Sequence, residues 1–154
     1  MWKKRLSAIV AVSLVALGTT AGAVASSHHR NKGDAWLDNA GQPPGPGHEM
    51  DPHLTCDDLN LWGDKMADPS GPFTIIGLPP TGNREVVYSN QWNYDRGQGG
   101  DQIMQSIDVA PLIQAAERNG DRAINKQGFH FKLQLVQQPQ KHKSFWIRCP
   151  NGSF

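Results

Sequence analysis

Two cysteines, Cys56 and Cys149, offer the simplest chemistry in this sequence. Neither lies in a C-x-x-C pair or beside a histidine, so a metal site or a reactive thiol would lack the neighbours it needs. The chain begins with the pattern of an export signal, and exported chains form disulfides in the oxidising compartments they enter. We therefore predict one disulfide between Cys56 and Cys149, which would close nearly the whole domain into a loop.

The segment Ser26-Ser27-His28 could bind a metal ion if the signal is cleaved after Ala25. A free α-amine, two deprotonated amides and an imidazole in third position form a square-planar nitrogen set, a geometry that suits Cu(II) or Ni(II). Cleavage after Ala23 would move His28 to the fifth position and abolish the site. Copper or nickel is therefore the one cofactor that the sequence suggests, and the alternative is that these histidines bind nothing.

A third group of residues lies on the outward side of a predicted hairpin near the C-terminus. Apolar and polar residues alternate over 129–135 and again over 145–149, which predicts two half-buried strands. The polar positions carry His130, Lys132, Trp146 and Arg148. An exposed tryptophan among cations can stack on sugars or bind an acidic partner, and it can equally pack against Lys132. These four residues are the predicted binding site.

Motifs of common catalytic sites do not occur in the chain. The sequence has no G-x-S-x-G, no H-E-x-x-H and no phosphate-binding glycine motif followed by a helix. With both cysteines paired, no thiol remains as a nucleophile. We therefore expect a protein that is not an enzyme, and a secreted hydrolase is the third hypothesis after binding and metal capture.

Residues 1–25 have the three parts of a secretory signal peptide. Lys3, Lys4 and Arg5 precede a short apolar run, and two A-x-A sites end at Ala23 and Ala25. The run is too short to cross a bilayer, so we expect no transmembrane anchor in the mature chain. Loss of the signal changes the formal net charge from +1 to −2 and removes any global argument for nucleic-acid binding. The signal is of a bacterial kind and predicts a secreted protein.

The remaining chain divides into two parts. Residues 26–52 are rich in glycine and proline and predict a flexible arm, because such a composition buries little apolar surface. Residues 53–154 predict one domain, with short β-like runs over 59–64, 73–76, 85–94 and 103–107 before the final hairpin. One short helix is expected between the run 103–107 and the final hairpin, capped by Asp108 and ended by Asn119-Gly120.

This pattern predicts a small all-β sandwich, jelly-roll-like or Ig-like, with one short helix and one disulfide. The stretch Ile107-Asp108-Val109, the helix and the strand from Gly128 resemble jelly-roll domains of secreted and cell-wall proteins, and this resemblance implies a fold and no function. We expect a monomeric, secreted, non-catalytic module that binds an unknown extracellular or cell-envelope ligand.

Overall fold

The computed structural model describes residues 33–43, 52–124, 126–139 and 142–150, and these residues form a two-layer β-sandwich. The predicted signal peptide, the metal-binding residues Ser26, Ser27 and His28, and most of the predicted arm lie outside the described residues. The elements are β1 (Asp34–Asn39), β2 (His53–Thr55), β3 (Leu59–Asp64), β4 (Ser70–Gly77), β5 (Val86–Asn93), β6 (Gln102–Ile107), α1 (Val109–Arg118), β7 (Phe129–Leu135) and β8 (His142–Arg148).

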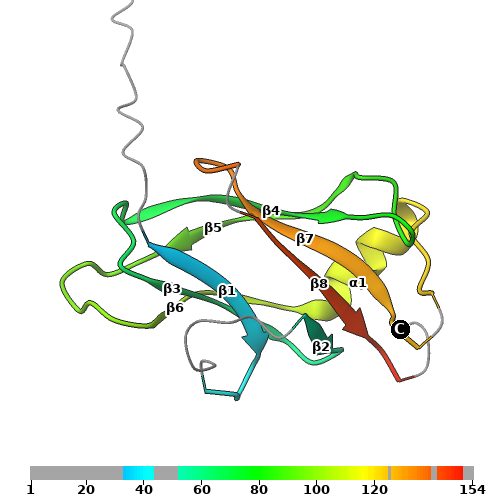
Figure 1. The fold of residues 1–154 in the computed structure, drawn as a ribbon, viewed down its shortest axis with the longest axis horizontal. Coiled ribbons are helices and arrows are strands. Elements are labelled where there is room, and N and C mark those ends of the chain that lie inside the picture. Colours follow the sequence, from blue (N-terminus) through cyan, green and yellow to red (C-terminus); the bar gives the residue numbers. More distant parts are fainter. Residues whose placement is uncertain (1–32, 44–51, 125, 140–141, 151–154) are drawn as a thin grey trace, which may run out of the picture.

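The two sheets differ in size, and the core lies between them (Figure 1). The smaller sheet has the strand order β1-β3-β6 and the larger has the order β2-β8-β7-β4-β5. Every strand pair is antiparallel except β2 with β8, which is parallel. Alternate residues of each strand point inward, so Phe73, Phe131 and Phe145 are fully buried. The predicted fold class, an all-β sandwich with one short helix and one disulfide, is confirmed.

The domain begins earlier in the chain than the sequence predicts. Residues 34–39, which the sequence analysis places in a flexible arm over 26–52, form β1 and pair with β3 along its whole length. Trp36 is fully buried and stacks on Trp62, its partner across the two strands, with ring centroids 6.3 Å apart. The arm prediction is wrong for β1, because its order comes from pairing with a partner strand and not from its own composition.

Helix α1 lies across one end of the sandwich (Figure 1) and has the caps that the sequence predicts. The Asp108 side chain accepts a hydrogen bond from the Ala110 amide at 3.1 Å, which satisfies one of the free N–H groups of the first turn. Asp58 accepts another from the Val109 amide at 3.2 Å. The buried side of the helix carries Val109, Leu112, Ile113 and Ala116, so α1 closes the core at this end.

The predicted disulfide joins the ends of the two parallel strands. Thr55 of β2 is opposite Arg148 of β8, so Cys56 and Cys149 follow in matching positions, with Cα atoms 4.8 Å apart and a sulfur–sulfur bond of 2.01 Å. The bridge therefore ties the three-residue strand β2 to the last strand of the domain. Within the described part of the chain, no helix has the length and apolar character needed to span a membrane.

Candidate binding face

Five residues that lie on the outer surface of β2, β8 and β7 form what we call the basic face: His53, His130, Lys132, Trp146 and Arg148. Phe129, Phe131, Phe145 and Ile147 of the same hairpin are buried, so period-two alternation turns the intervening residues away from the core. His53 of β2 and His130 of β7 are both opposite Trp146 of β8. The strand register thus makes a row His53–Trp146–His130 across three adjacent strands.

The rings of His130 and Trp146 stack face to face, with centroids 4.3 Å apart and planes inclined by 7°. Neighbouring strands are about 4.8 Å apart, so rings that stack across them stand upright on the sheet. Rings that lay flat on the sheet would meet edge to edge instead. One face of the Trp146 ring is therefore covered by His130, and the pair presents ring edges to the solvent.

His130 is held in place by the loop between β4 and β5. Its ring Nδ1 lies 2.8 Å from the Pro79 carbonyl oxygen, which can only accept, so Nδ1 carries the proton. Its backbone N–H donates to Thr81 Oγ1 at 2.8 Å, and that hydroxyl donates to the Leu78 carbonyl at 3.1 Å. The histidine is thus fixed from both its ring and its backbone, and Nε2 is the ring atom left for a ligand.

The charge of the basic face is uniform in sign because the C-terminal part of the sequence contains no acid. Residues 123–154 carry five Lys or Arg and no Asp or Glu. Within the described residues, the side chains of Lys132 and Arg148 make no ion pair or hydrogen bond. Neither cation is tied up in an ion pair with a described carboxylate, so both are available to an acidic partner.

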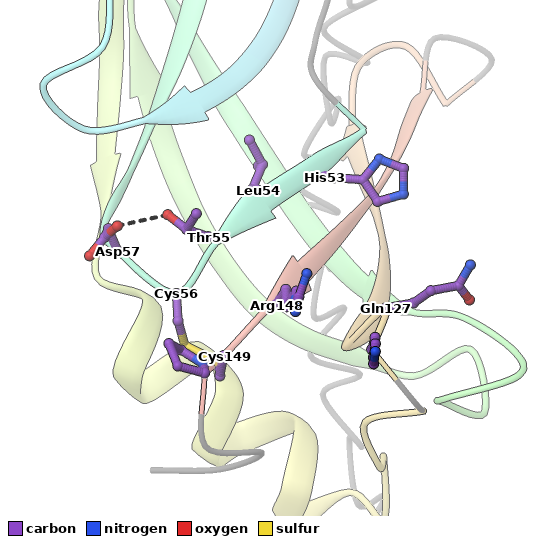
Figure 2. Close-up of a pocket in the computed structure, with 10 residues that line it drawn as sticks. His53, Leu54, Thr55, Cys56, Asp57, Gln127, Arg148 and Cys149 are labelled. Carbon is purple, nitrogen blue, oxygen red and sulfur yellow. Dashed lines mark hydrogen bonds between the residues drawn. A yellow bond between two sulfur atoms is a disulfide. The ribbon is translucent and has the colours of Figure 1, made fainter.

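A cavity of about 870 Å³ opens at the lower end of this face, beside the disulfide (Figure 2). Its walls come from the β2 end, the turn before β7 and the end of β8: His53, Leu54, Thr55, Cys56, Asp57, Lys126, Gln127, Arg148, Cys149 and Pro150. In the view of Figure 2, Arg148 lies between the hydrogen-bonded pair Thr55 and Asp57 on one side and Gln127 on the other. Thr55 Oγ1 donates to Asp57 Oδ2 at 2.7 Å. The cavity therefore offers both cationic and acceptor groups.

The structure brings the four predicted residues onto one surface and adds others that the sequence analysis missed. Trp146 and His130 are in contact, Lys132 lies two residues further along β7, and Arg148 lies two residues beyond Trp146. The added residues are His53 and Thr55 from β2 and Lys126 and Gln127 from the turn. A three-residue strand has no measurable period, so no local signal predicts that β2 joins β8.

Asp121 is the described acidic residue with the least ordinary surroundings. The residue is 1% exposed, and neither of its carboxyl oxygens has a hydrogen-bond partner among the described residues. Burial raises its pKa above the ordinary value of 3.8, and the nearby Glu85 adds to this rise while Arg122 opposes it. The carboxyl lies against Gly77 and Gly82, where a Cβ atom would collide with it. Because it is enclosed, Asp121 cannot contact a substrate. Its burial affects the stability of the folded domain instead.

Among the described residues, no group of three or more His, Cys, Asp or Glu side chains could hold a metal ion. The predicted copper or nickel site lies outside these residues and stays a prediction. No protein-family model, no curated protein and no solved structure matches this chain. Because a fold alone does not imply a function, the functional argument depends on the geometry of the basic face.

Proposed function

We propose that the protein is a secreted, non-catalytic binding module whose basic face recognises an acidic extracellular partner. The observation that carries the proposal is the pair of uncompensated cations, Lys132 and Arg148, on either side of a fixed Trp146–His130 stack. The Cys56–Cys149 disulfide fits an oxidising extracellular setting.

The orientation of the aromatic pair favours an acidic partner over a neutral sugar. A sugar that binds by stacking needs an open aromatic face, whereas His130 covers one face of Trp146 and His53 is opposite Trp146 on the other neighbouring strand. Ring edges carry the positive end of the aromatic quadrupole, and the Trp146 indole N–H is a hydrogen-bond donor at such an edge. Edges and cations together suit carboxylate, sulfate or phosphate groups.

Binding of the mature, disulfide-bonded protein to acidic polymers tests this proposal. We expect binding to dextran sulfate and to poly-L-glutamate, weaker at higher salt, and no binding to neutral dextran or to poly-L-lysine. Replacing Lys132 and Trp146 together with alanine should weaken binding by about fivefold or more. Lys65→Ala is the matched control. Lys65 follows β3, which belongs to the other sheet, and its Nζ forms an ion pair with Asp64 Oδ2 at 3.2 Å. Equal binding of neutral and acidic polymers would overturn the proposal.

A further inference from the structure

We propose that the cavity beside the disulfide is a subsite for one anionic sugar residue of an acidic polysaccharide. The inference rests on the proposed function and narrows it from any acidic partner to a polysaccharide. It depends on the mixed chemistry of the cavity, on the blocked outer edge of β2 and on the continuity of the cavity with the aromatic row.

The cations of the cavity come from two separate elements. Arg148 ends β8 and Lys126 lies in the turn before β7, and both line the cavity. Both side chains are exposed and neither is paired within the described residues. A carboxylate or sulfate between them would receive charge-assisted hydrogen bonds, with the planar guanidinium able to bind two oxygens at once.

The opposite side of the cavity supplies acceptors. Asp57 uses one carboxylate oxygen to accept from the Thr55 hydroxyl at 2.7 Å, and the carboxylate retains further lone pairs. A ligand that was only anionic and had no donor, such as sulfate, would be repelled by Asp57. A ligand with hydroxyl groups beside its anionic group would use both sides, because hydroxyls donate to Asp57 while the anion lies on Arg148 and Lys126.

An extended acidic peptide is disfavoured because the outer edge of β2 is already occupied. Asn39 of β1 donates to the Thr55 carbonyl at 3.2 Å and accepts from the Thr55 amide at 2.9 Å. These bonds occupy both backbone groups of Thr55, where an added strand would have to pair beside the cavity. A peptide therefore cannot extend this sheet beside the cavity, whereas a sugar needs no backbone pairing.

The cavity is continuous with the aromatic row. Thr55 lines the cavity opposite Arg148, and His53 is two residues earlier opposite Trp146. Two residues of a strand span about 6.6 Å, and His53 belongs both to the cavity wall and to the aromatic row. A polysaccharide with one residue in the cavity would thus place its neighbour against Trp146 and His130.

The test measures binding of four polymers to the mature, disulfide-bonded protein by isothermal titration calorimetry. Polygalacturonate supplies carboxylates and dextran sulfate supplies sulfates, while poly-L-glutamate is the acidic peptide and neutral dextran is the control. We expect at least one acidic polysaccharide to bind more tightly than poly-L-glutamate, and the stronger of the two identifies the anionic group. Lys126→Ala and Arg148→Ala should each weaken it about tenfold, with Lys65→Ala unchanged.

Asp57→Asn gives the sharpest result, because two explanations predict opposite signs. If the cavity attracts anions by net charge alone, loss of a carboxylate should strengthen binding. If sugar hydroxyls donate to the charged Asp57 carboxylate, its replacement by a weaker neutral amide acceptor should weaken polysaccharide binding several-fold and leave poly-L-glutamate binding unchanged or stronger. Thermal melts of each variant establish that it is folded.

The outcomes separate the two proposals. Tighter binding by Asp57→Asn, unchanged binding by Lys126→Ala, or equal affinity for poly-L-glutamate and the polysaccharides would overturn the subsite. The proposed function of the basic face would still be supported if replacing Lys132 and Trp146 together with alanine weakened binding. Absence of binding to every acidic polymer would overturn both proposals.

Discussion

Removal of the Cys56–Cys149 disulfide tests how the fold and the candidate site depend on one another. The perturbation is the double variant Cys56→Ser and Cys149→Ser, compared with a Cys56→Ala and Cys149→Ala variant that excludes effects of the hydroxyl groups. The bridge joins residues separated by 93 positions. A closed loop of about 100 residues lowers the entropy of the unfolded chain by an amount worth about 4.7 kcal/mol.

This loss is large compared with the whole stability of such a domain. Domains of this size are stable by about 5–15 kcal/mol, so the variant should lose about 30% or more of its free energy of unfolding. We expect this loss in urea unfolding followed by tryptophan fluorescence, as a lower midpoint. The slope with urea should rise, because an unbridged unfolded chain exposes more surface.

The bridge should also have a local effect at β2. This strand has three residues, and its neighbour Pro52 accepts a hydrogen bond from the Trp146 amide at 2.7 Å. Without the bridge β2 should detach more often, and hydrogen exchange at the Trp146 amide should accelerate more than at amides between β4 and β7. A stability loss below about 1 kcal/mol, with unchanged exchange at Trp146, would refute this reasoning.

Three further results are expected. Burial raises the pKa of Asp121, so the folded state binds the Asp121 proton more tightly than the unfolded state does. The protonated side chain therefore contributes stability below the unfolded pKa, and this contribution is lost as pH rises through the folded pKa. In urea titrations, Asp121→Asn should therefore gain stability relative to the parent between pH 3 and pH 7, and parallel pH curves would contradict this. Asp108→Ala should lower the free energy of unfolding by about 0.5–2 kcal/mol through loss of the N-cap bond of α1, and an unchanged urea midpoint would argue against the cap. Mass spectrometry of the secreted protein should give a mature chain beginning at Ser26, and a Cu(II) titration should show a visible absorption band that His28→Ala removes; any other first residue ends the metal hypothesis.

Local signals were sufficient wherever a segment carries its own pattern. The alternation over 129–135 predicts β7 because every second residue must face the core. Asp108 and Asn119-Gly120 predict the ends of α1, because capping depends on residues adjacent in the chain. The pairing of Cys56 with Cys149 follows from the number of cysteines together with the predicted export signal.

Local signals failed where a segment depends on a distant partner. The β1 segment lies among polar residues, and its burial follows from the pairing of Trp36 with Trp62. The carboxyl of Asp121 is enclosed because the end of β4 brings Gly77 against it and the following loop brings Gly82 against it. Neither feature can be read from the neighbouring sequence.

The sequence by itself determined an all-β fold, one helix, one disulfide and four of the five residues of the basic face. Only the tertiary structure decided that β2 pairs in parallel with β8, which adds His53 to the row and makes the cavity between β2, β8 and the turn before β7. The physical reason is the range of the interactions. Periodicity and capping act within a few residues, whereas pairing between strands some 90 residues apart is selected by the free energy of the whole packed sandwich.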